Sequence, residues 1–229
     1  VKADEAVIHK EFHLSSADPK LVGTDKSIPV GFTNFMVADQ LADVGMEAIH
    51  PKASKPLEMA GINIRIKNTF EPEHPGTLIS KDYFTEKSRI EIVSGTDKVI
   101  AVEVHDPMMV GEVGYDLKVM QVFEKYGVSY ILKSTNANSI TMVIWDKPQA
   151  QKLIEELKET FYQITTKQVA LVCCMETNIA HPGFLYKASK ALFDNNINIE
   201  CFAQSMRQVN MQFVIERGDY GKAIIALND

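Results

Sequence analysis

The chain lacks the composition of several large classes of protein. Only three of its 229 residues are cysteine, and two of these, Cys173 and Cys174, are adjacent, so a disulfide framework is excluded. Basic residues are not in excess, because 24 Lys and Arg stand against 30 Asp and Glu and give a net charge of −6. This balance argues against a nucleic-acid partner, which a cluster of basic residues would attract.

Long hydrophobic runs are also missing. No apolar stretch approaches the roughly 20 residues that a helix needs to cross a bilayer. The opening residues, VKADEAVIHKEF, mix charged with apolar side chains and do not have the pattern of a signal peptide. We therefore expect no membrane partner, and the low cysteine content favours a cytoplasmic location.

An internal repeat organises the second half of the chain. The segment GYDLKVMQVFEKYGVSYIL (114–132) aligns with GFLYKASKALFDNNINIEC (183–201), an offset of 69 residues. The same offset pairs Phe123 with Leu192 and Met142 with Met211. One constant offset across a helix and its flanking strands indicates two copies of one structural unit.

Each copy has the pattern of strand, helix, strand, strand and helix. Short apolar runs at 99–104 and 169–174 have strand length, and Gly114 and Gly183 each precede a helical pattern. The last helix of the first copy is predicted to start with Asp146 as its cap, whereas that of the second starts near Asp219 and is a turn shorter. The pattern predicts two small ferredoxin-like α+β modules, each with its helices on one face of an antiparallel sheet.

The first hundred residues have a different, α/β character. The pattern predicts a helix over 37–44 capped by Asn34, a second helix over 53–60 closed by Gly61, and a strand over 62–66. No strand-loop-helix nucleotide motif is evident there. This part therefore has the character of the end of a larger domain.

The segment GMEAIHPKASKPLEMAGINIRIKNTFEPEHPGTLI (45–79) resembles the end of the catalytic domain of aspartate kinases. The two repeats resemble the tandem ACT modules that follow this domain in that family, including the HPG at 181–183. Two segments are most similar to the aspartokinases associated with ectoine biosynthesis: SSADPKLVG (15–23) and VADQLADVGMEAIHP (37–51). The resemblance covers nearly the whole chain.

The resemblance implies a fold, a division into domains and a function. Residues 1–88 would be the C-terminal part of an amino-acid-kinase domain, 89–165 the first ACT module (βαββαβ) and 166–229 the second, truncated in its last helix. The parent enzyme would transfer a phosphoryl group from MgATP to the side-chain carboxylate of L-aspartate. The phosphate loop of the family is absent, so we expect no catalytic residue in this chain, no activity from it alone and no cofactor bound by it alone.

The resemblance leaves a remnant of the ATP side at residues 9–22. Ser16, Asp18 and Lys20 fall in the family's ATP-side segment, with Lys20 as a cation beside the phosphates. His9, Lys10, Ser15 and Glu47 depart from the family pattern, which puts nucleotide contacts at those four positions in doubt. The alternative is that Asp18 and Pro19 only form a turn.

The residues considered for metal or nucleophilic chemistry favour structural roles. His9 and His13 are four residues apart, but no third ligand follows at a suitable spacing, so we expect no metal site. Cys173 and Cys174 would point to opposite faces of a strand and pack in the core.

The loops before Gly114 and Gly183 are the candidates for ligand binding. A glycine loop that opens into a helix exposes backbone N–H groups at the positive end of the helix, which suits the carboxylate of an amino acid. The alternative is a structural turn. By the resemblance, the effector-binding residues of the first module would be Met109, Gly114, Tyr115, Asp116, Ser134, Thr135 and Asn136.

One position departs from the lysine-inhibited relatives. They carry an acid in the strand after the first helix, and this sequence has Ile131 near that position. An apolar residue cannot balance the ammonium of a bound lysine, so we expect weak or altered feedback by lysine.

The resemblance also implies a homodimer formed through the ACT modules, an amino-acid effector, and the possibility that RIEIV (89–93) adds a strand to the second module. Two alternatives remain open at this stage. One is a free-standing amino-acid-binding ACT module without catalysis, and the other is a purely structural dimerisation unit.

Overall fold

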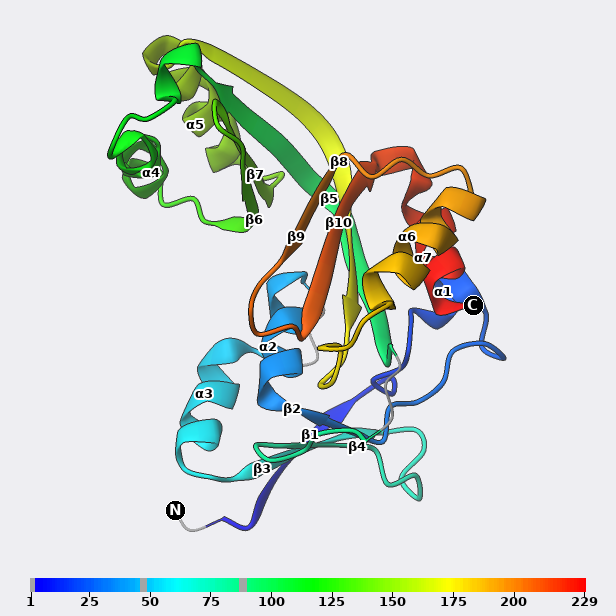
Figure 1. The fold of residues 1–229 in the computed structure, drawn as a ribbon. Coiled ribbons are helices and arrows are strands. Elements are labelled where there is room, and N and C mark those ends of the chain that lie inside the picture. The colour runs from blue at the N-terminus through cyan, green and yellow to red at the C-terminus, as the bar shows by residue number, and fades with distance from the viewer. Residues whose placement is uncertain (1–2, 46–48, 87–89) are drawn as a thin grey trace.

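The computed structural model describes residues 3–45, 49–86 and 90–229, which form two sheets with helices packed on them (Figure 1). Glu47, Arg89 and the predicted domain boundary at 88/89 lie outside the described residues. The strands of the first sheet are β1 (Glu5–Lys10), β2 (Phe32–Asn34), β3 (Asn63–Asn68) and β4 (Thr77–Ser80), in the order β1-β3-β4-β2. The strands of the second sheet are β5 (Ile92–His105), β6 (Tyr130–Thr135), β7 (Ser139–Trp145), β8 (Gln163–Met175), β9 (Cys201–Gln204) and β10 (Asn210–Glu216).

The first sheet is covered on one face by two helices, α2 (Phe35–Asp43) and α3 (Pro51–Met59). The helix α2 begins where predicted, because the Asn34 side chain accepts a hydrogen bond from Val37 N at 3.1 Å. The helix α3 begins two residues earlier than predicted, with Pro51 in its first turn, and is followed by Gly61 at φ +69°. A short helix, α1 (Pro19–Val22), lies between β1 and β2 in the sequence.

The second sheet is a single antiparallel sheet in the order β6-β7-β5-β8-β10-β9, shared by both repeats. The long strands β5 and β8 run through both copies. Residues 92–96 of β5 pair with 171–175 of β8, and residues 99–105 of β5 pair with 163–169 of β8. Each half therefore has four strands in ferredoxin-like order, and the second obtains its outer strand from the start of β5.

The shared strands correct one sequence expectation and support another. The apolar runs at 99–104 and 169–174 are parts of strands of 14 and 13 residues, not short separate strands. Ile92 and Val93 pair with Met175 and Cys174, so the end of the RIEIV segment joins the second half of the sheet.

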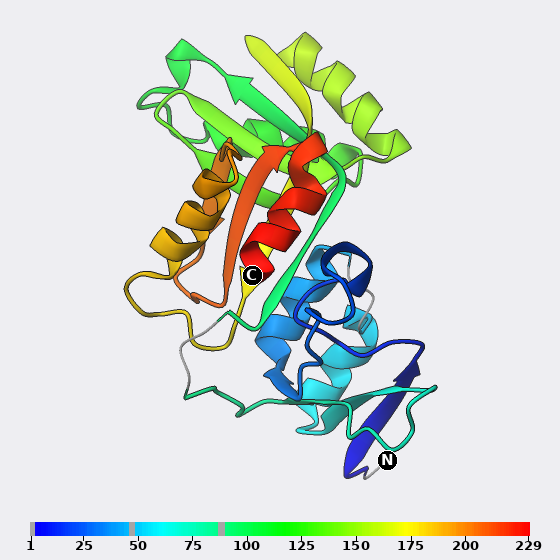
Figure 2. The same cartoon turned by 90° about the vertical axis from the view of Figure 1, so that its right-hand side faces the viewer.

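The repeat helices are α4 (Tyr115–Lys125), α5 (Pro148–Thr160), α6 (Phe184–Asp194) and α7 (Tyr220–Asn228), with short 3₁₀ turns η1 (Pro107–Met109) and η2 (Arg217–Asp219). Figures 1 and 2 show α4 and α5 at one end of the second sheet and α6 and α7 side by side at the other. Gly114 and Gly183 cap α4 and α6 in the left-handed conformation, as their positions predict. The predicted Asp146 cap is wrong: Lys147 is the cap residue without a side-chain bond, and Asp146 lies 3.4 Å from Arg217 Nη2.

Alternation along β8 divides the interior into cores. Ala170, Val172 and Cys174 pack with α6 and α7, whereas Leu171 and Cys173 face the core that α2 enters. Both adjacent cysteines are buried on opposite faces of the strand, as predicted. The outer strands β6 and β9 approach each other, so the sheet curls around this central core. The predicted α+β class with ferredoxin-like modules is confirmed.

Candidate functional site

The carboxylate of Asp106 holds the loop before α4 in shape by two hydrogen bonds within the loop. Asp106 Oδ1 accepts from Met108 N at 2.8 Å, which starts η1, and Asp106 Oδ2 accepts from the Tyr115 hydroxyl at 2.9 Å. Gly114, at φ +83°, turns the chain directly into α4. The loop is therefore held at both ends, and the first N–H groups of α4 point away from the helix body.

Two of the predicted effector residues have side chains that point into the core. Met109 and Tyr115 are 8% and 7% exposed and pack with the helix-facing residues of β5 and β7. The Tyr115 ring also contacts Phe161, with ring centroids 5.8 Å apart. Burial, followed by the bond to Asp106, raises the pKa of Tyr115 to about 12. These two residues can contribute only through their backbone or by fixing the loop.

The other predicted residues lie at one edge, where α4 meets β6. The Lys133 ammonium, on β6, pairs with Asp116 in the first turn of α4. Ser134 and Thr135 continue β6 and pair with Thr141 and Ile140 of β7. The remaining member, Asn136, donates its backbone N–H to Ser139 O at 2.8 Å. The structure thus brings Asp116 beside the strand that carries the Ser-Thr-Asn segment.

Lys133 is a residue that the sequence reasoning missed. Its side chain is 19% exposed, and its ammonium lies at the positive end of α4. A cation beside free helix N–H groups is a favourable place for a carboxylate. The sequence feature that could have indicated Lys133 is a single charged residue in β6, between the apolar Leu132 and the polar Ser134.

Ile131 lies on the other side of this strand. It is 9% exposed and packs in the central core, next to a register shift between Tyr130 and Leu132. Neither Ile131 nor Leu132 offers a carboxylate to the α4–β6 edge.

The corresponding loop of the second repeat has different contacts. Thr177 Oγ1 accepts from Thr85 N at 3.0 Å, and Asn178 Nδ2 donates to Thr85 O at 2.9 Å. The preceding Glu176 is 1% exposed, and its Oε1 accepts from the Thr177 hydroxyl at 2.8 Å. Burial and the nearby Glu91 raise the pKa of Glu176 to about 7, although the bonds from Thr177 act in the opposite direction. This loop is tied to the segment that leads into β5.

The predicted ATP-side residues lie together in the segment that contains α1. Asp18 caps α1 by accepting from Lys20 N at 2.9 Å, so its carboxylate binds the chain's own backbone. Asp18 and Lys20 border a cavity of about 480 Å³ that Trp145 and Tyr220 also line. The Ser16 hydroxyl points the other way and bonds to Asn228 at 2.9 Å. The three residues are close in the chain but do not converge on one point.

No group of three or more potential metal ligands is found within residues 3–45, 49–86 and 90–229. His13 Nε2 lies 3.1 Å from Glu71 Oε2, and its ring is 4.2 Å from that of His74, whereas His9 lies in β1. Among the same described residues, no helix has the length and apolar character needed to span a membrane.

Comparison with known proteins finds a family model for part of the chain and similar folds for nearly all of it. Residues 176–229 match the model of an ACT domain. The chain also superimposes on the crystal structure of Clostridium acetobutylicum aspartate kinase, with a TM-score of 0.89 and 26% identity over 99% of this chain and 54% of that one. The Escherichia coli aspartokinase III complex with aspartate and ADP gives a TM-score of 0.86 at 17% identity, over 98% of this chain and 52% of that one, and supports the fold alone.

The sequence relatives show a higher similarity to one particular aspartate kinase. Aspartate kinase Ask_Ect of Stutzerimonas stutzeri is 46% identical over 99% of this chain and 48% of its own length. Aspartokinase 3 of Bacillus subtilis is 26% identical over 93% of this chain and 48% of its own length. The chain is similar to aspartate kinases along almost its whole length, as its motifs predicted, and it spans about half the length of these relatives.

Proposed function

We propose that this chain is the regulatory C-terminal part of an aspartate kinase that phosphorylates the side-chain carboxylate of L-aspartate with MgATP. The observation that carries the proposal is the 46% identity with Aspartate kinase Ask_Ect across 99% of this chain. On this proposal, residues 1–88 complete the catalytic domain, while 89–165 and 166–229 are the two ACT modules. The enzyme acts in the cytoplasm.

ATP is the substrate of the whole enzyme, and this chain supplies only part of its surroundings. Lys20 beside the cavity at α1 fits a phosphate, because it places a cation there. Asp18 fits a magnesium ion less well, since its carboxylate already caps α1. We therefore assign Asp18 to shaping the segment and Lys20 to the phosphate side, with Ser16 supporting the loop.

The α4–β6 edge is the proposed effector site. The Lys133 ammonium and the first N–H groups of α4 bind the carboxylate of an amino acid, with Gly114 allowing the turn and Asp116 facing its amino group. Ser134, Thr135 and Asn136 line the opposite side of the site, while Met109 and Tyr115 anchor the loop in the core. Binding favours one arrangement of the shared sheet and so biases the distant kinase site.

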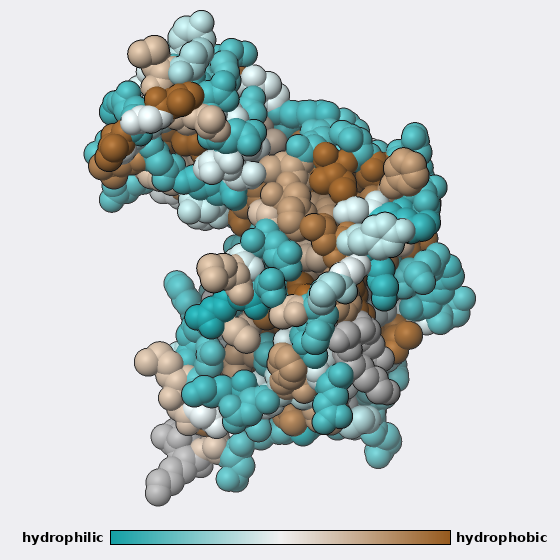
Figure 3. Space-filling view, in the orientation of Figure 1, coloured by the Kyte–Doolittle hydropathy of each residue, from teal (hydrophilic) through white to brown (hydrophobic). Residues whose placement is uncertain are grey.

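The loop before α4 and the first turn of α4 are also the proposed contact between two copies in a homodimer. Four apolar side chains of the loop and α4 are exposed: Met108 at 75%, Val110 at 62%, Val113 at 97% and Leu117 at 62%. Figure 3 shows apolar surface gathered on this lobe of the molecule. Covering it by a second copy would remove that surface from water.

The test is an ADP-release assay on the full-length protein and on this chain alone. We expect aspartate-dependent ADP release from the full-length protein and none from this chain. A full-length protein without aspartate-dependent release, but with a melting temperature that rises with an amino acid, would instead indicate a sensing module without catalysis.

A further inference from the structure

We propose that Asn228, at the end of α7, is a positioning residue for the ATP-side segment. It holds Ser16 and the loop that follows through two hydrogen bonds from the second ACT module. This inference depends on the proposed kinase function, because the segment's role in ATP binding comes from it.

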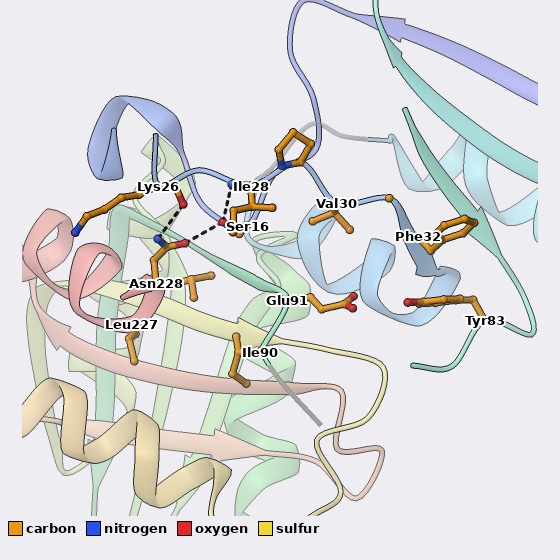
Figure 4. A pocket seen from close by; sticks show the side chains of 13 residues that line it. Ser16, Lys26, Ile28, Val30, Phe32, Tyr83, Ile90, Glu91, Leu227 and Asn228 are labelled. Carbon is orange, nitrogen blue, oxygen red and sulfur yellow. Dashed lines mark hydrogen bonds between the residues drawn. The ribbon is translucent and has the colours of Figure 1, made fainter. Parts of the chain in front are cut away.

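The side chain of Asn228 joins both ends of one loop (Figure 4). The Ser16 hydroxyl donates to Asn228 Oδ1 at 2.9 Å, and Asn228 Nδ2 donates to Lys26 O at 3.4 Å. Ser16 also pairs with Ile28, through Ile28 N to Ser16 Oγ at 3.1 Å and Ser16 N to Ile28 O at 2.8 Å. One side chain of α7 therefore fixes the entry and the exit of the loop that contains α1.

The underside of the same segment is part of the second module's core. Ala17 is fully buried and Val22 is 8% exposed, and both pack in the core that contains Ala223 and Ile224 of α7. Leu21 packs against the same core. Because packed interfaces move as units, a shift of α7 moves the ATP-side segment with it.

A neighbouring ion pair is less suited to this role. Lys26 Nζ lies 2.7 Å from Asp229 Oδ1, but the two side chains are 49% and 47% exposed. Exposed pairs are screened by water and salt, and they contribute little to fixing a geometry. The partly buried hydrogen bond between Ser16 and Asn228 is the more specific constraint.

The variant Asn228→Ala removes both bonds without weakening α7 itself. Alanine has a higher helix propensity than asparagine, and the core contacts of α7 come from Ala223 and Ile224. In the full-length enzyme we expect the KM for ATP to rise about three- to tenfold, the effect of losing a hydrogen bond. The KM for aspartate and kcat should stay within about twofold of wild type, since the proposed function places this segment on the ATP side.

Two further variants sharpen the experiment. Asn228→Asp keeps an oxygen that accepts from Ser16 but loses the N–H that donates to Lys26 O, so its KM for ATP should lie between those of Asn228→Ala and wild type. Lys222→Ala, at an exposed position of the same helix, is the matched control and should leave every constant unchanged. If Asn228→Ala lowers kcat and raises the KM values for both ATP and aspartate, its role is purely structural and the proposal is overturned.

A double-mutant cycle with Ser16→Ala tests the contact itself. If the hydrogen bond between Ser16 and Asn228 is the link, the double variant should raise the KM for ATP by clearly less than the product of the two single effects, because the shared bond is lost only once. Multiplicative effects would overturn the proposal. A wild-type enzyme without aspartate-dependent turnover would refute the kinase function, whereas an active wild type with an unchanged Asn228→Ala variant would refute only this inference.

Discussion

Replacing Glu176 with glutamine probes a carboxyl group that the fold buries at the end of β8. The side chain is 1% exposed and lies near a second carboxyl group, that of Glu91. The pKa of Glu176 is raised to about 7, mainly by burial and also by the nearby Glu91, while the hydrogen bonds from Thr177 act in the opposite direction. The folded protein therefore favours the protonated form of this group.

The sign of the pH effect follows from this direction. A carboxyl group whose pKa is raised on folding contributes stability below its unfolded value, and this contribution is lost as the pH rises through the folded value. The interval from the ordinary 4.5 to about 7 corresponds to at most about 3 kcal/mol. Glutamine stays neutral at every pH, so Glu176→Gln should be more stable than wild type by about 2–3 kcal/mol at pH 8 and nearly equal to it below pH 4.5.

The assay is urea unfolding of this chain between pH 4 and 8.5, followed by the fluorescence of Trp145, the single tryptophan. Glu155→Gln, at an exposed position of α5, is the matched control and should show no pH-dependent difference. A Glu176→Gln difference that is the same at pH 4.5 and pH 8, or that destabilises at pH 8, would refute the reasoning.

Two other predictions concern the sheet and the effector. A Cβ atom on Gly95 would lie 2.1 Å from Leu171 O, so Gly95→Ala should lower the free energy of unfolding in urea by about 2–3 kcal/mol. Gly218→Ala, with open space around it, should leave that free energy unchanged. Equal effects of the two variants would contradict the close approach of β5 and β8. Calorimetric titration should show that lysine binds at least about tenfold more weakly than threonine, because Ile131 faces the core and supplies no carboxylate for the side-chain ammonium of lysine. Tight binding of lysine at the α4–β6 edge would contradict this prediction.

The repeat made much of the fold predictable from the sequence. A fixed offset of 69 residues placed the helices correctly, and the turn glycines Gly114 and Gly183 take the left-handed conformation that their positions require. Side-chain alternation also placed Cys173 and Cys174 on opposite faces. These features depend on neighbours in the sequence, which a pattern records directly.

The shared sheet was harder to predict because it depends on pairing between distant segments. Residues 163–168 are polar or half exposed, so they do not look like a strand, yet they pair with β5 along its second half. The Asp146 cap failed for a similar reason, since its carboxylate lies toward Arg217, 71 residues away. No local pattern contains either contact.

The candidate sites were predicted as segments but not as side-chain directions. Asp116 pairs with Lys133, which precedes the Ser134–Asn136 segment, whereas Met109 and Tyr115 turn into the core. Lys133 was missed because a single lysine on a strand usually marks an exposed face. Its pairing with Asp116 depends on how α4 lies over β6, which only the fold shows.

The most direct test of the effector site is the titration of amino acids into the full-length protein and its Lys133→Ala variant. The account predicts that at least one aspartate-derived amino acid binds, and that Lys133→Ala weakens its binding by about tenfold or more, as expected for loss of a charged hydrogen bond. Lys152→Ala, exposed on α5, should bind as wild type does. Undiminished binding in Lys133→Ala, or no binding of any such amino acid to the wild type, would contradict the effector site at the α4–β6 edge.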